Sequence, residues 1–164
     1  MRSLYHLTAA TLVLSQLAAS AVWAADPAPP PPPPAAAPTP ASPLVAARAH
    51  IKAKNWPAAI DELRRVNATG DADWNNLMGF ALRMQATPDL DGAQRFYDAA
   101  LRLNPQHLGT LEYAGQLALM KSDLPTAEAR LAVLSRVCPR GCDELDNLKK
   151  SVARFKVDGK PPTY

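Results

Sequence analysis

The sequence predicts an all-α fold for residues 43–157, and three observations support that class. From Leu44 onward, apolar side chains recur every three or four residues, which is the spacing of an amphipathic helix. The helix formers Ala, Leu, Arg, Glu and Lys dominate the same stretch. Only 6% of the chain is aromatic, which argues against a β-sandwich, because strands are enriched in aromatic and β-branched residues. Helices are expected at about 44–53, 57–67, 72–86, 90–104, 107–121, 125–138 and 143–156.

Residues 1–24 have the composition of a secretory signal peptide. Arg2 supplies a positive charge, and the stretch from Leu4 to Trp23 carries no Asp, Glu, Lys or Arg. Val22 and Ala24 occupy the two positions that a signal peptidase inspects, so cleavage is expected after Ala24. Such a leader predicts a periplasmic or secreted protein. Retention as a membrane anchor is the alternative, because about 20 apolar residues can span a bilayer.

Residues 25–42 form a Pro/Ala-rich segment, with an unbroken proline run from Pro29 to Pro34. Each proline fixes φ and removes an amide donor, so a disordered spacer with polyproline II character is the favoured interpretation. A ligand for a proline-binding domain is the alternative. Without the leader the chain keeps 17 basic and 15 acidic side chains, because only Arg2 is lost from the 18 basic residues. The resulting charge of +2 is too small to predict nucleic-acid binding or attraction to a membrane surface.

The helical region contains an internal repeat. Pro105 and Pro139 stand 34 residues apart, and each ends a similar apolar phrase. A period of this length is typical of stacked helix-turn-helix units. The recurring positions are Leu111, Ala114, Gly115, Ala118, Ala127, Leu131 and Pro139 in the last unit, Gly79, Leu82, Ala93, Tyr97, Ala100 and Pro105 in the preceding unit, and Ala47, Ala59, Leu63 and Val66 in the first.

At these positions the sequence resembles the tetratricopeptide repeat (TPR) family, in the form of an exported bacterial TPR-domain protein. The resemblance covers residues 44–139. The sequence departs from the family pattern by two extra residues in the turn at 86–89 and by Trp74, which stands one place early. The resemblance implies a TPR-like α-solenoid of about three repeats, with Gly79 and Gly115 where the two helices of a repeat approach most closely.

A final helix is expected to cap this array. Leu145, Leu148, Val152 and Phe155 form one apolar stripe along it, and its other side chains are mostly polar. Acidic residues come early in the helix and basic residues late, in agreement with the helix dipole. One face of the capping helix would cover the last repeat, and the other would face solvent. The tail at 158–164 is expected to be flexible.

Cys138 and Cys142 are the two cysteines of the chain, and they frame a turn that contains Pro139 and Gly141. In the oxidising compartment that the leader predicts, such a pair usually forms a disulfide, which is the favoured interpretation. A Cu(I) site of two thiolates, a redox-active pair and free thiols remain open alternatives. A zinc site is not expected, because it needs about four ligands and the histidines are distant in sequence.

Motifs of known catalytic chemistry are missing from the sequence. It contains no phosphate-binding glycine loop, no His-Glu-x-x-His and no Gly-x-Ser-x-Gly. Neither an enzyme nor a bound cofactor or metal is therefore expected. The neighbouring side chains of Lys149 and Lys150 are interpreted as part of a solvated helix face.

In the TPR family the first helix of each repeat lines a concave groove that holds a peptide. The resemblance therefore implies a non-catalytic scaffold that binds a peptide or protein partner of the cell envelope. The alternative is a periplasmic Cu(I)- or redox-handling protein that uses the turn between Cys138 and Cys142. The groove residues that the resemblance implies are Arg48, Ile51, Lys52, Asn76, Phe80, Arg83, Met84, Glu112, Tyr113, Gln116 and Met120.

Overall fold

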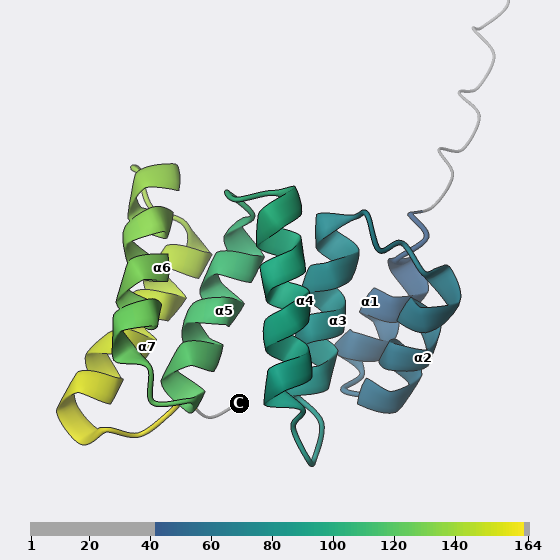
Figure 1. Ribbon diagram of the computed structural model, residues 1–164, viewed down its shortest axis with the longest axis horizontal. Coiled ribbons are helices and arrows are strands. Elements are labelled where there is room, and N and C mark those ends of the chain that lie inside the picture. Colours follow the sequence, from purple (N-terminus) through teal and green to yellow (C-terminus); the bar gives the residue numbers. More distant parts are fainter. Residues whose placement is uncertain (1–41, 163–164) are drawn as a thin grey trace, which may run out of the picture. The chain divides into compact units, whose positions relative to one another are not determined.

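The computed structural model describes residues 42–162, which contain seven α-helices and no β-strand (Figure 1). The all-α class is confirmed for this part of the chain. The predicted signal peptide at 1–24, all but the last residue of the spacer at 25–42, and residues 163–164 lie outside the described residues. The helices are α1 (Val45–Lys52), α2 (Trp56–Val66), α3 (Ala72–Arg83), α4 (Leu90–Leu103), α5 (Leu108–Met120), α6 (Leu124–Val137) and α7 (Asp143–Asp158).

Polar caps determine where α2 to α6 begin. In each of these helices the residue before the first turn has a side chain that accepts a hydrogen bond from the amide three residues further on. These local signals explain why the helix starts lie within one residue of their predicted positions. The capping side chains belong to Asn55, Asp71, Asp89, His107 and Asp123.

The end of α3 differs from its prediction. The helix stops at Arg83 rather than at 86, and residues 84–89 form the connection to α4. The amide of Asp89 donates to the carbonyl oxygen of Leu82 over 3.1 Å, so the chain turns back before another helical turn is made. Pro88 reinforces this end, because a residue that precedes proline avoids the α-helical region.

The helices form two layers that pack differently. Consecutive helices contact each other throughout, and α1, α3, α5 and α7 also contact one another in that order. Among the described helices, α2, α4 and α6 make no such contacts with each other. The odd-numbered helices thus form a continuous layer, and two neighbouring even-numbered helices are connected through the odd-numbered helix between them. Buried apolar side chains between the layers form two clusters, one over α1–α5 and one over α5–α7.

Two glycines allow close contacts between helices. A Cβ atom on Gly79 would lie 2.7 Å from the ring of Tyr97 and 3.1 Å from the carbonyl oxygen of Ala93, so α3 and α4 meet there as predicted. The sequence also predicts that Gly115 serves the contact between α5 and α6. The structure instead places Leu148 of α7 against it, 2.6 Å from where a Cβ atom would be. Helix α7 therefore uses the space that this glycine leaves.

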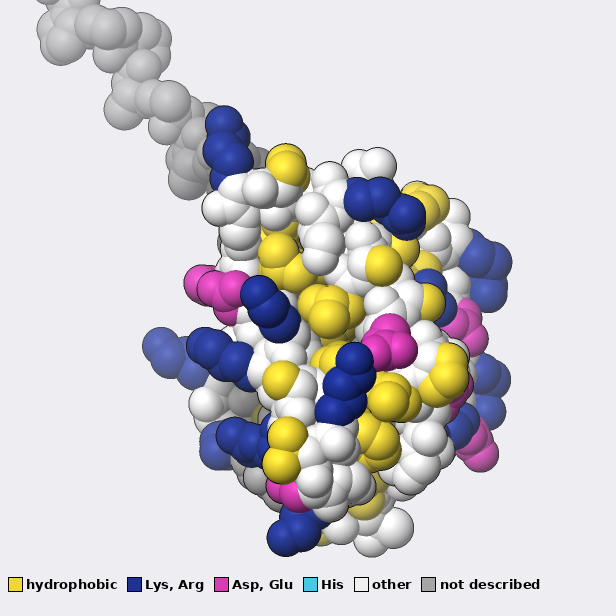
Figure 2. Space-filling model, turned by 90° about the vertical axis from the view of Figure 1, so that its left-hand side faces the viewer, with side chains coloured by type: hydrophobic (Ala, Val, Ile, Leu, Met, Phe, Trp, Pro, Cys, Tyr) yellow, Lys and Arg dark blue, Asp and Glu magenta, His cyan; other side chains and the backbone are white. Residues whose placement is uncertain are grey.

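The predicted apolar stripe of α7 is directed into the fold. Leu148 and Val152 are buried, and Leu145 and Phe155 pack half-buried against the same cluster. The helix continues to Asp158, slightly beyond its predicted end, and stops where the next residue adopts a left-handed conformation. Figure 2 shows hydrophobic and charged side chains mixed on the end face formed by α6 and α7. No helix within residues 42–162 is both long and apolar enough to cross a membrane.

Candidate functional site

A pocket of about 410 Å³ opens to solvent on the layer of odd-numbered helices, and we call it the α3/α5/α7 pocket. Side chains four residues apart share one face of a helix, and such pairs from α5 and from α7 line its two sides. Four of its residues belong to the groove that the sequence implies, and three from α7 do not. The lining residues are Phe80 from α3, Glu112, Tyr113 and Gln116 from α5, and Asn147, Lys150 and Ser151 from α7.

Arg83 lies beside this pocket, next to two aromatic rings whose centres are 4.7 Å apart. Its guanidinium carbon is 5.5 Å from the ring centre of Phe80 and 5.4 Å from that of Tyr113, which are cation–π distances. Its Nη1 atom donates to Oε1 of Gln116 over 3.2 Å. Only 1% of Arg83 is exposed. This predicted groove residue therefore holds α3 and α5 together and sets the positions of the two rings.

Glu112 is a buried acid at the edge of the pocket. Its carboxylate accepts a hydrogen bond of 2.9 Å from Nε2 of Gln116. The pKa of Glu112 is raised from its usual 4.5 to about 7, mainly by burial and also by the charge of Glu144. Hydrogen bonds from Asn147 and Gln116 and the charge on Arg83 act in the opposite direction. A carboxyl group with such a perturbed pKa in a pocket is typical of functional sites.

The contribution of Glu112 to stability is expected to fall as the pH rises from about 4.5 to about 7. The pKa of Glu112 in the folded protein lies above its value in the unfolded chain, so protonation of Glu112 favours folding. This stabilisation is complete below about pH 4.5 and is lost as the pH rises past about 7. Glu112→Gln should remove this pH dependence. Urea unfolding of both proteins between about pH 4 and about pH 8 tests it, and a constant difference between their unfolding free energies would contradict the assignment.

Two other predicted groove residues belong to a separate polar network. Nη2 of Arg48 donates to Asp73 over 2.7 Å, and Nε2 of His107 lies 2.8 Å from the other oxygen of that carboxylate. The hydrogen bond from His107 is the main reason that the pKa of Asp73 lies below its usual value. The hydroxyl of Thr110 donates to the side-chain oxygen of Asn76 over 3.1 Å. The network thus connects α1, α3 and the start of α5.

Asp73, His107 and Thr110 have the residue types of a hydrolytic triad, but their geometry is that of a helix cap. Nδ1 of His107 accepts from the amide of Thr110 over 3.0 Å, so the proton of the neutral ring is on Nε2 and faces Asp73. Thr110 is completely buried, at 0% exposure, and its hydroxyl cannot reach a substrate. We therefore assign these three side chains to the positioning of α5.

The remaining residues of the implied groove lie apart from the pocket. Lys52 is exposed at the end of α1, and Ile51, Met84 and Met120 are half-buried. The structure thus unites only part of the implied set, namely Phe80, Arg83, Glu112, Tyr113 and Gln116.

The contribution of α7 is what sequence reasoning missed. Lys150 is exposed, as expected for a solvated face, but its place in the lining of the pocket beside Asn147 and Ser151 was not predicted. Positions 147, 150 and 151 are spaced so that they share one face of a helix, and this spacing was the sequence signal that could have identified a polar face of α7. A resemblance restricted to 44–139 could not assign this face of the capping helix.

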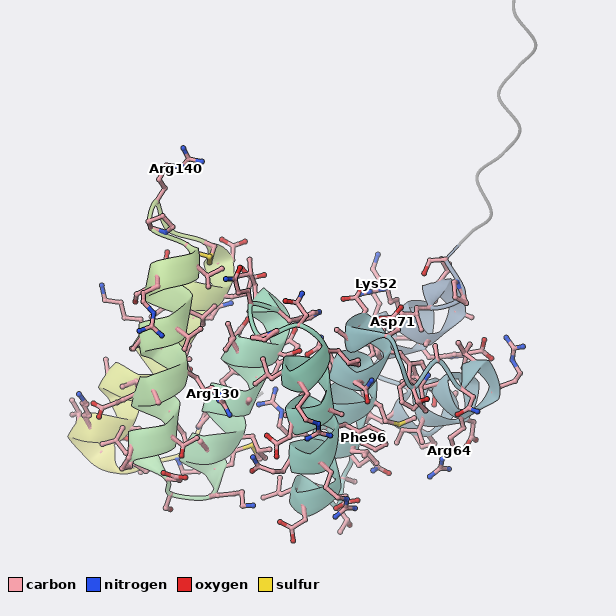
Figure 3. The ribbon with its side chains drawn as sticks, turned by 45° about the horizontal axis from the view of Figure 1, so that its top comes forward. Lys52, Arg64, Asp71, Phe96, Arg130 and Arg140 are labelled. Atoms are coloured by element: carbon pink, nitrogen blue, oxygen red, sulfur yellow. A yellow bond between two sulfur atoms is a disulfide. The ribbon has the colours of Figure 1, made fainter. Side chains whose placement is uncertain are left out.

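The two cysteines are close enough to be bonded. The sulfur atoms of Cys138 and Cys142 lie at disulfide-bonding distance, with their Cα atoms 5.9 Å apart. Gly141 has a φ of +91°, which allows the tight turn between them, and Arg140 extends from the tip of the turn (Figure 3). In this bonded form neither sulfur is a thiolate that could bind Cu(I). Within residues 42–162 no three His, Cys, Asp or Glu side chains are grouped so as to hold a metal ion.

No protein-family model matches the chain. No curated protein is significantly similar to it.

Proposed function

We propose that this protein is a non-catalytic, exported TPR-like scaffold that binds a peptide or protein partner of the cell envelope. The leader supports export to the periplasm or beyond. The 34-residue period supports a solenoid of three repeats with a capping helix, and so does the order of contacts, because stacked helix pairs place their first helices side by side. The partner would bind on the layer formed by α1, α3, α5 and α7.

The α3/α5/α7 pocket carries this proposal. Phe80 and Tyr113 offer aromatic surface, which is enriched at protein interfaces. The amide of Gln116 is already bonded to Arg83 and Glu112, whereas the exposed side chain of Asn147 has an amide donor and acceptor that suit a peptide backbone. Lys150 adds a charge at the rim. An extended or helical peptide with an apolar anchor fits this combination of groups.

Cross-linking in the native compartment would identify the partner. A photoreactive amino acid at position 150 should capture one envelope protein reproducibly, because Lys150 lines the pocket. The same reagent at exposed position 149, which does not line the pocket, is the matched control. Equal capture from both positions would argue against the pocket as the contact surface.

Lys150→Glu is expected to weaken binding of the captured partner roughly tenfold, which corresponds to about 1.4 kcal/mol. The neighbouring exposed substitution Lys149→Glu changes the net charge equally and should leave affinity unchanged. Calorimetry with purified partner measures both variants. If the two lose affinity to the same extent, the effect is one of overall charge and the proposed surface is wrong.

A further inference from the structure

The groove between α4 and α6 is a second cavity, on the other side of α5 from the pocket described above. Within the described residues the backbones of α4 and α6 stay apart, and Leu111 of α5 lines the groove between them. Leu111 and Tyr113 are two residues apart on α5 and therefore point in nearly opposite directions. The cavity has a volume of about 700 Å³, within the range of ligand pockets. We call it the α4/α6 groove.

The equivalent groove between α2 and α4 is partly filled by an aromatic side chain. There Phe96, the seventh residue of α4, packs edge-on against Trp74 with ring centres 5.7 Å apart, and the remaining cavity is about 320 Å³. The seventh residue of α6, 34 positions later, is Arg130. Figure 3 shows this side chain extending from α6 toward α5. A charged group thus stands where the neighbouring groove has an aromatic one.

The arginines of the α4/α6 groove have no acidic partner in the described part of the chain. Arg130 and Arg136 both line the groove, and neither forms an ion pair within residues 42–162. The Nε atom of Arg130 is buried and has no hydrogen-bond acceptor among the described residues. A buried donor without an acceptor is costly and is uncommon in folded proteins.

Apart from the polar Gln106 in the turn before α5, the rest of the lining is apolar. Leu101 of α4, Leu111 of α5, and Val133 and Val137 of α6 form the walls. The groove therefore combines two guanidinium groups with aliphatic surface. A guanidinium group binds a carboxylate through two parallel hydrogen bonds, and aliphatic walls accept an apolar side chain.

We propose that the α4/α6 groove binds a peptide segment of a partner protein in which an acidic side chain adjoins an apolar one. The carboxylate pairs with the guanidinium group of Arg130 where it lines the groove, and Arg136 holds a second acidic group or the same one. The apolar side chain enters between Val133 and Leu111. This site is separate from the α3/α5/α7 pocket, so it stands whether or not that pocket binds the envelope partner.

Selection from a random peptide library on the mature protein tests this proposal. We expect enriched peptides to carry Asp or Glu next to Leu, Ile, Val or Phe, and a synthetic copy with Gln in place of the acid to bind weakly. Arg130→Gln should weaken binding of the acidic peptide roughly tenfold or more, because a hydrogen bond to a charged group is lost. Arg140→Gln is the matched control, since Arg140 lies at the turn outside the groove.

If circular dichroism shows that Arg130→Gln is misfolded, Arg136→Gln provides the same test, because Arg136 is exposed and its replacement should not disturb the fold. Unchanged affinity in the folded variants would overturn the proposal, and so would enriched peptides that lack a carboxylate, or no enrichment at all. Binding of octanoate but of no acidic peptide would assign the groove to a lipid-like anion and would also overturn it.

Discussion

Replacing Trp74 by alanine is expected to lower the free energy of unfolding by about 3–5 kcal/mol, the usual loss for a buried tryptophan. Trp74 is only 3% exposed. Its Nε1 atom donates to the carbonyl oxygen of Leu63 in α2 over 2.7 Å, and its ring packs on Phe96 of α4. One side chain thus connects three helices. A loss of this size is a large fraction of the stability of a small domain.

Trp74→Phe separates the hydrogen bond from the packing. It keeps an aromatic ring and removes the donor, and the carbonyl of Leu63 still accepts from the amide of Asn67 at 2.9 Å. The expected loss is therefore smaller, about 1 kcal/mol for the hydrogen bond plus the reduced ring area. Urea unfolding followed by circular dichroism measures both variants. A loss below about 1 kcal/mol for Trp74→Ala would show that α2, α3 and α4 do not depend on this contact.

The second large effect is expected where α7 meets α5. Gly115→Val should destabilise the fold by about 1–3 kcal/mol or more, because a Cβ atom would overlap Leu148, which is completely buried. Leu148→Ala alone should cost about 2–5 kcal/mol through the cavity it leaves. Combined, the two changes should cost less than their sum, because valine fills part of the space left by leucine.

Gly109→Ala is the control for this pair. Position 109 also lies in α5, but a Cβ atom there would be 3.5 Å from the nearest side chain, an ordinary contact. Alanine also favours helix over glycine by about 1 kcal/mol, so no loss of stability is expected. Thermal unfolding of all four variants provides the comparison. Strictly additive effects of Gly115→Val and Leu148→Ala would show that the two residues do not share the contact.

The helices themselves could be predicted closely because their signals are local. Apolar periodicity marked each buried face, and capping side chains three residues from their amide donors marked the starts of α2 to α6. The end of α3 was wrong because its stop depends on a hydrogen bond from Asp89 back to Leu82, across seven positions. The nearness of Cys138 and Cys142 was predictable, since a short turn brings them together.

The candidate sites were predicted only in part. The resemblance placed Phe80, Tyr113 and Gln116 together, but it gave no sign that Arg83 and Glu112 are buried. These properties arise from contacts between α3 and α5, about one repeat apart in sequence. The α4/α6 groove was not predicted, because no local sequence pattern indicates which helix backbones stay apart.

The sequence by itself determined the helical class, the order and starts of the helices, and the cysteine turn, because each depends on residues a few positions apart. Only the tertiary structure decided which polar side chains are buried and which glycine meets α7. It also decided where cavities remain. Burial and cavities depend on side chains from helices distant in sequence meeting in space, and the periodicity of a single helix carries no record of its partners.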